Sequence, residues 1–140
     1  MIRIMLVDDN RTFLAAVRKF LMLQPGTQVV AEAHNGTDAL ALAAQVHPDL
    51  ILLDIVMPGM NGFEVAKSMQ AWPKSPQILF LSMHDNESYR LAARKIGALG
   101  LVGKSDFVVE LMPMIDSLVA GECAGQTGIA SVSNGLNDPL

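Results

Sequence analysis

The sequence predicts an α/β protein in which five parallel strands alternate with helices in a single sheet. Five short runs rich in leucine and β-branched residues recur along the chain, at residues 2–7, 28–33, 49–53, 77–81 and 99–102. Each run is too short for a helix, and stretches with helical periodicity separate the runs. The run at 50–53 has no alternating polar residue, which is typical of a strand covered on both faces. Right-handed crossovers then give a flavodoxin-like, doubly wound sheet, for which we expect the strand order 2-1-3-4-5.

The first helix is predicted from the spacing of Phe13, Leu14, Val17 and Leu21, which places these residues on one face. The second helix repeats this spacing near residues 39–44, the third covers 63–71 and the fourth covers 87–96. Residues that commonly end helices follow each of them in turn: Pro25-Gly26, His47-Pro48, Trp72-Pro73 and Gly97.

The last helix is predicted at about residues 106–120, with apolar side chains around most of its circumference. Such a helix usually packs against a second partner, so we expect it to be the surface through which a homodimer would form. Pro113 lies within it, and because an interior proline removes a hydrogen bond, the helix either kinks there or starts near Glu110.

Residues 1–120, which contain all the predicted strands and helices, are predicted as one folded domain. Residues 121–140, rich in glycine and serine, are predicted as a flexible tail or the start of an interdomain linker.

Length and composition exclude several classes of protein. The 140 residues are enough for one domain and leave no room for a second. Because 51% of them are apolar and 17% are charged, the chain is not intrinsically disordered. The net charge is −4, with lysine and arginine scattered singly, so we expect no direct nucleic-acid binding by this chain.

No targeting or membrane segment is predicted. The apolar runs are far shorter than the roughly 18 residues of a membrane span, and the first run meets Asp8 too early for a signal peptide. We therefore expect a soluble, cytoplasmic protein without membrane contact.

Cys123 is the only cysteine, which excludes an internal disulfide and a cysteine-rich metal site.

Three acidic residues follow two strands that the expected order makes neighbours. Asp8 and Asp9 follow the first strand, and Asp54 follows the third. Because ligands of such sheets bind beyond the carboxyl ends of the strands, these carboxylates should converge on one pocket. Clustered carboxylates repel each other unless a cation neutralises them, and an all-oxygen ligand set suits Mg²⁺. The alternative is that Asp8, Asp9 and Asn10 merely cap the first helix, and that Asp54 merely starts a turn before Pro58.

Ser82 follows the fourth strand and Lys104 follows the fifth. They add one hydroxyl and one ammonium to the same rim, where they can meet an anion beside Asp54. A loop serine or lysine is ordinarily solvated, so the prediction depends on their shared position at the strand ends.

The chain resembles the receiver domain of two-component response regulators over about residues 1–120. Four segments carry the resemblance: Leu6-Val7-Asp8-Asp9-Asn10, Leu53-Asp54-Ile55-Val56-Met57-Pro58-Gly59-Met60-Asn61-Gly62, Leu81-Ser82, and Gly97-Ala98-Leu99-Gly100-Leu101-Val102-Gly103-Lys104. The segment from Ser82 to Asp85, and Ser105 in place of a proline after Lys104, are similar to the NarL/FixJ (LuxR-type) subfamily. In that subfamily the receiver normally precedes a helix-turn-helix domain that controls transcription.

The resemblance implies a role for each of these side chains. Asp54 would be the phosphoacceptor, and Asp9 and Asp54 would bind Mg²⁺ directly together with the Val56 carbonyl. Asp8 would bind Mg²⁺ through water. Ser82 would bond a phosphoryl oxygen and act as the switch, and Lys104 would pair with the phosphoryl charge.

The chemistry implied by the resemblance is phosphoryl transfer from phosphohistidine on a sensor histidine kinase to Asp54. The protein would then catalyse only its own phosphorylation and dephosphorylation and would otherwise be no enzyme. Leu101 stands where many receivers carry Tyr or Phe, so we expect the readout to rest on the fourth helix or on dimerisation.

Three alternatives remain open from sequence. The chain can be a stand-alone receiver, or a degenerate one that acts as a protein-interaction module without phosphorylation. It can also be a Mg²⁺-dependent phosphohydrolase with an aspartate nucleophile, although such an enzyme usually has a second acid two residues later, where Val56 stands.

Overall fold

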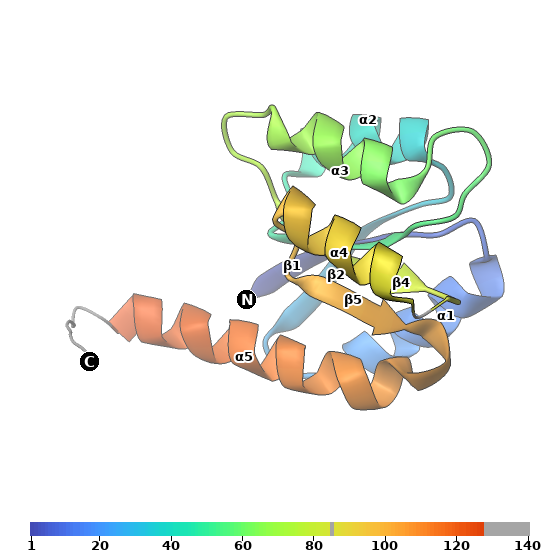
Figure 1. Ribbon diagram of the computed structural model, residues 1–140. Helices are drawn as coiled ribbons and strands as arrows, with labels where there is room; N and C mark the ends of the chain where they lie inside the picture. The colour runs from blue at the N-terminus through green and yellow to red at the C-terminus, as the bar shows by residue number, and fades with distance from the viewer. Residues whose placement is uncertain (85, 128–140) are drawn as a thin grey trace.

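The computed structural model describes residues 1–84 and 86–127, which form one five-stranded sheet flanked by helices (Figure 1). In chain order the elements are β1 (Ile2–Val7), α1 (Arg11–Met22), β2 (Thr27–Ala33), α2 (Gly36–Val46), β3 (Leu50–Asp54), α3 (Gly62–Gln70), β4 (Gln77–Ser82), α4 (Glu87–Ile96), β5 (Gly100–Gly103), the 3₁₀ turn η1 (Lys104–Asp106) and α5 (Phe107–Thr127). All strand pairs are parallel and the order is β2-β1-β3-β4-β5. The predicted fold class and strand order are confirmed.

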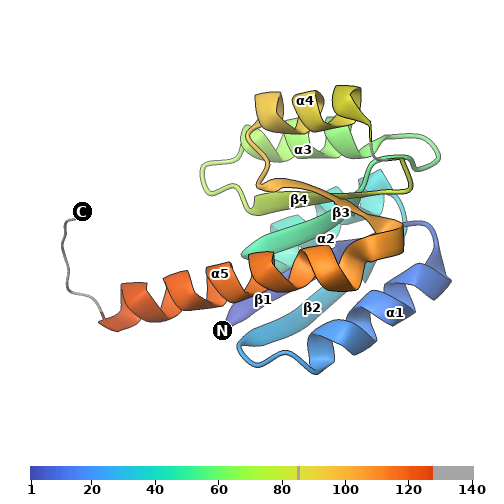
Figure 2. The same ribbon diagram turned by 60° about the horizontal axis from the view of Figure 1, so that its bottom comes forward.

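The sheet separates two layers of helices, as Figure 2 shows. Side chains of β1 and β3 point alternately to opposite sides, because successive residues of a strand face opposite surfaces. Ile51 and Leu53 join the core cluster that includes side chains of α2, α3 and α4. Leu50 and Leu52 join the cluster that includes side chains of α1 and α5. The unbroken apolar run at 50–53 is thus explained by a strand that is covered on both faces.

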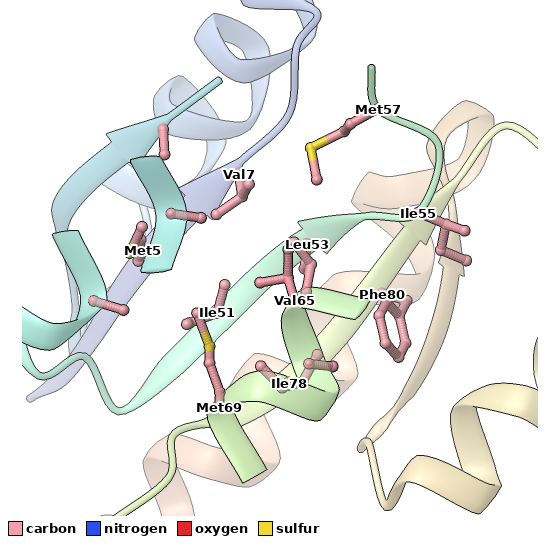
Figure 3. Packing of buried hydrophobic residues seen from close by; sticks show 14 of the residues in the cluster. Met5, Val7, Ile51, Leu53, Ile55, Met57, Val65, Met69, Ile78 and Phe80 are labelled. Carbon is pink, nitrogen blue, oxygen red and sulfur yellow. The ribbon is translucent and has the colours of Figure 1, made fainter. Parts of the chain in front are cut away.

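Close packing fills the layer beneath α2 and α3. In Figure 3 the side chains of Ile51 and Leu53 from β3 lie beside those of Val65 and Met69 from α3, and Met5 from β1 belongs to the same cluster. All five are buried. This layer holds β1 and β3 rigidly beside each other, so the residues that follow them are fixed in position.

Asparagine caps each of the first four α-helices. The side chains of Asn10, Asn35, Asn61 and Asn86 accept hydrogen bonds from backbone N–H groups three residues later, which satisfies a donor that the helix itself leaves free. At α3 the Glu64 carboxylate accepts a hydrogen bond from the backbone N–H of Asn61, which completes a capping box. The helices therefore begin at defined points just beyond the strand ends.

The last helix begins within one residue of its predicted start at about 106 but ends later than predicted. Helix α5 begins at Phe107, directly after the η1 turn, so the predicted alternative start near Glu110 is wrong. Pro113 lies inside the helix on an exposed turn, where water can solvate the carbonyl that it leaves without a partner. The helix continues to Thr127 and projects past the sheet (Figures 1 and 2).

The first seven residues of the predicted tail, 121–127, are therefore helical, because the glycines there do not stop the helix. The rest of that tail, residues 128–140, lies outside the described residues, and the division into a domain and a linker stays a prediction. Within the described residues, no helix combines the length and the apolar character needed to cross a bilayer.

Candidate functional site

Three carboxylates gather at the carboxyl ends of β1 and β3. Asp54 is the last residue of β3, and Asp8 and Asp9 follow β1, whose Val7 pairs with Leu53. One oxygen from each of the three carboxylates lies within 4.8 Å of the others. Asp8 and Asp54 are buried and Asp9 is exposed. The structure thus brings together the three acids that the sequence predicts for one pocket.

Helix capping does not account for these acids. Asn10 is the N-cap of α1 and accepts the Phe13 N–H, whereas Asp8 Oδ1 accepts the Asn10 N–H at 2.9 Å. The next helix in the chain beyond Asp54 is capped by Asn61. The capping prediction is therefore confirmed for Asn10 and wrong for Asp8 and Asp9.

Lys104 supplies a cation to this pocket from the end of β5. Its Nζ lies 2.6 Å from Asp8 Oδ2 and 3.3 Å from Asp54 Oδ1, and its side chain is only 7% exposed. Within the described part of the chain, this buried Asp8 oxygen accepts no hydrogen bond, so its contact with Lys104 is an ion pair. One ammonium therefore pairs with two buried carboxylates.

Burial, and after it repulsion by Asp8, raise the pKa of Asp54 from 3.8 to about 7, although the Lys104 ammonium lowers it. Desolvation disfavours the charged carboxylate more than one nearby ammonium can stabilise it. The nucleophilic form of Asp54 thus needs additional positive charge near neutral pH. Hard oxygen ligands of this kind fit Mg²⁺, so the set of three carboxylates is compatible with that ion.

Ser82 is the last residue of β4. This strand pairs with β3, and its Leu81 lies opposite Asp54 of β3. The Ser82 hydroxyl is buried and donates to the His84 carbonyl at 2.8 Å, and it accepts the His84 N–H at 2.9 Å. This hydroxyl therefore already donates its hydrogen to the His84 carbonyl, in the segment that leads to α4. Any bond from Ser82 to an anion beside Asp54 must replace the bond to His84.

The loop after Asp54 packs against the backbone of the site. A Cβ atom on Gly62 would lie 2.3 Å from the Asp54 carbonyl oxygen, so only glycine fits there. The Gly62 N–H donates to the Ile55 carbonyl at 2.8 Å, and the loop turns at Gly59, which has a φ of +78°. Val56, the predicted carbonyl ligand, lies in this loop with an exposed side chain.

The sequence reasoning missed one residue at this site, the aromatic side chain of Phe13. The Lys104 Nζ lies over its ring, 4.9 Å from the centroid. Phe13 belongs to the apolar face of α1, and helical periodicity alone describes it as a packing residue. No motif signals the contact, because α1 and the end of β5 are remote in the chain.

Comparison with known proteins places the chain among two-component regulators. The model of the response regulator receiver domain matches residues 4–116. The chain is similar to the transcriptional regulatory protein DegU of Brevibacillus brevis, with 36% identity over 118 residues, which cover 81% of this chain and 50% of that protein. It is similar to the nitrate/nitrite response regulator NarL of Escherichia coli, with 35% identity over 85% of this chain and 55% of that protein.

A solved structure agrees with this similarity. The signal receiver domain of the NarL regulator from Mycobacterium tuberculosis superposes with a TM-score of 0.78 at 32% identity, which covers 86% of this chain and 97% of that chain. The chain spans about half the length of the curated relatives that it matches.

Proposed function

Because the chain belongs to the response regulator receiver family of two-component systems, we propose that it is phosphorylated on Asp54 by a sensor histidine kinase. The observation that carries the proposal is the pocket in which Lys104 contacts both Asp8 and Asp54. An oxygen of the Asp54 carboxylate attacks the phosphorus of phosphohistidine, and the bond from phosphorus to the imidazole nitrogen breaks. The product is an acyl phosphate on Asp54, which water later hydrolyses.

Mg²⁺ is the proposed cofactor, held by Asp8, Asp9, Asp54 and the Val56 carbonyl, with Asp8 acting through water. The closeness of the three carboxylates supports this ligand set. When bound, the ion would neutralise charge on the transferring phosphoryl group. The chain's own residues position the reaction: β1 and β3 fix the carboxylates, and Gly62 lets the loop close against Asp54.

Lys104 and Ser82 take the two remaining roles. The Lys104 ammonium, already 3.3 Å from Asp54 Oδ1, pairs with the phosphoryl group once that group is attached. The Ser82 hydroxyl donates to a phosphoryl oxygen and releases the His84 carbonyl, to which it now donates. Because His84 then loses this bond, the start of α4 shifts, so α4 is the element that reports phosphorylation.

The output is proposed to be transcriptional, through a helix-turn-helix domain. DegU is named a transcriptional regulatory protein and NarL a response regulator. Both are about twice as long as the segment that matches this chain, which supports a further domain in the whole protein. The receiver itself has no proposed contact with DNA. Family membership also supports a cytoplasmic protein that acts on itself rather than an enzyme with other substrates.

Dimerisation through α5 is the proposed second readout. Val108, Val109 and Met112 expose apolar side chains on this helix, and that of Val109 is 75% exposed. Exposed apolar patches of this kind support a protein contact. Leu101, the residue at the usual aromatic position, is buried opposite Phe80 in the sheet, so it does not offer a surface signal.

Treatment with acetyl phosphate tests the proposed function without a kinase. With Mg²⁺, we expect one phosphoryl adduct in the intact mass, absent in Asp54→Asn and absent when EDTA replaces Mg²⁺. A chain that gains no adduct under these conditions would be a degenerate receiver. Steady release of phosphate without an adduct would indicate a phosphohydrolase.

A further inference from the structure

The Lys104 ammonium has an aromatic neighbour as well as its carboxylate partners. Its Nζ lies over the Phe13 ring, 4.9 Å from the centroid, and 2.6 Å from Asp8 Oδ2. A cation at this distance over a ring face is attracted by the electron density of the ring, and the attraction is larger where water is excluded. The Lys104 side chain is only 7% exposed, so the contact is largely desolvated.

The Phe13 ring is itself fixed by two further aromatic residues. It meets Phe107 edge to face at 5.3 Å and 75°, and Phe107 meets Phe20 at 5.7 Å and 83°. Such T-shaped pairs are the preferred geometry of aromatic contacts. Phe107 is the first residue of α5 and stands three residues after Lys104. The lysine and the helix that follows it are therefore anchored to the same face of α1, on one side of the sheet (Figure 2).

A leucine at position 13 would fill much of the same space but would present no ring face to the ammonium. Lys104 would then be oriented only by the two carboxylates, and both of these change partners in the proposed reaction. A cation that must meet the transferred phosphoryl group has to stay aligned while those partners change. The ring of Phe13 takes part in no proposed bond change, so it can hold the ammonium throughout.

From this geometry we propose that Phe13 is a positioning residue for Lys104, whose ring face aligns the ammonium for phosphoryl transfer to Asp54. The proposal rests on the proposed function, and it adds a residue that acts through the lysine without touching the phosphoryl group. Phe107 supports it by holding the orientation of the Phe13 ring.

Fluorinated phenylalanine at position 13 tests this role, because fluorine withdraws electron density from the ring face and changes its size little. Mono-, di- and trifluorinated residues should lower the rate constant for phosphorylation by acetyl phosphate in steps, to a total of about three- to tenfold. The KM for acetyl phosphate should change less than the rate constant. The same series at Phe20 is the matched control, since Phe20 lies on the same helix, is similarly half-buried and contacts the same Phe107 ring.

Conventional variants supply a second test. Phe13→Tyr keeps the ring face and should retain the wild-type rate within about twofold, whereas Phe13→Leu should lose about as much as the trifluorinated residue. Thermal unfolding of both variants separates this loss from a loss of folded protein.

The outcomes distinguish this inference from the proposed function. Equal rates across the fluorinated series at Phe13, in a wild type that is phosphorylated on Asp54, would overturn the positioning role and leave the proposed function intact. An equal decline at Phe13 and Phe20 would also overturn it, since the effect would then come from the aromatic packing. A wild type that gains no phosphoryl group would refute the proposed function itself.

Discussion

The Lys104 ammonium lies closer to Asp8 than to Asp54, at 2.6 Å from Asp8 Oδ2 and 3.3 Å from Asp54 Oδ1. Both carboxylates are buried, and a buried charge without a partner is strongly destabilising. In the absence of a divalent ion, the lysine thus holds the acidic pocket together. An ion bound by the carboxylates would take over that task and leave the lysine to meet the phosphoryl group.

The first prediction concerns the stability that Lys104 supplies. In EDTA, above neutral pH, Lys104→Met should lower the free energy of unfolding by roughly 2–4 kcal/mol, because two buried carboxylates lose their shared cation. Saturating Mg²⁺ should narrow this difference, because the ion should bind more tightly to the variant, in which no ammonium competes for the carboxylates. Urea denaturation with and without Mg²⁺ measures both values.

Lys95→Met is the matched control, because Lys95 is an exposed residue of α4. It should change the unfolding free energy by no more than about 0.5 kcal/mol in either condition. A difference between wild type and Lys104→Met that is the same with Mg²⁺ and with EDTA would argue against a shared role of lysine and ion.

The second prediction concerns pH. The pKa of Asp54 is raised from 3.8 to about 7, mainly by burial. Between these two values the folded state holds a proton that the unfolded state has released, so stability should fall as pH rises through that window. In EDTA the contribution of Asp54 should reach a slope of at most about 1.4 kcal/mol per pH unit and should level off above pH 7.

Asp54→Asn should remove this contribution, and Asp116→Asn controls for the loss of an exposed carboxylate on α5. Urea denaturation at several pH values measures the slopes. If the slope of the wild type in this window matched that of Asp54→Asn, Asp54 would have no raised pKa in the folded state.

The third prediction concerns the switch. Ser82→Ala loses the two hydrogen bonds with the His84 backbone and should cost roughly 1–2 kcal/mol of stability. It should still accept phosphate on Asp54, but the change in amide hydrogen exchange at the start of α4 on phosphorylation should disappear. Ser82→Thr, which keeps the hydroxyl, should preserve that change. Persistence of the α4 response in Ser82→Ala would remove Ser82 from the switch.

The fourth prediction concerns the oligomeric state. If α5 forms the dimer surface, Val109→Lys should weaken self-association of the phosphorylated protein by at least about tenfold, because a charged side chain would enter an apolar contact. Sedimentation velocity over a range of concentrations measures this effect. Leu91→Lys is the matched control, since Leu91 is an exposed apolar residue on α4. A wild-type mass that stays monomeric with and without phosphorylation would refute the dimer.

The sequence predicts most of this fold because its signals are local. Strand and helix periodicities identify the elements, and the parallel topology then brings Asp8 and Asp54 to one edge of the sheet. The grouping of the acids follows from that topology and does not require the side-chain conformations. The start of α5 is less predictable, since Pro113 favours an early position in a helix, whereas the η1 turn and the packing of Phe107 extend the helix ahead of it.

The finer features of the site depend on side-chain conformations that no local pattern specifies. The ring of Phe13 reaches Lys104 only because α1 and α5 pack on the same side of the sheet. The bond from Ser82 to His84 likewise depends on how the chain turns after β4. Sequence reasoning therefore identifies the residues of the pocket but misses the contacts that orient two of them.

The most direct test of the account is to locate the phosphoryl group. After treatment with acetyl phosphate and Mg²⁺, borohydride converts an aspartyl phosphate to homoserine, and peptide sequencing by mass spectrometry identifies the converted residue. Conversion is expected at Asp54 alone, although Asp8 and Asp9 lie in the same cluster. Conversion at Asp8 or Asp9, or a phosphorylated protein in which no aspartate is converted, would contradict it.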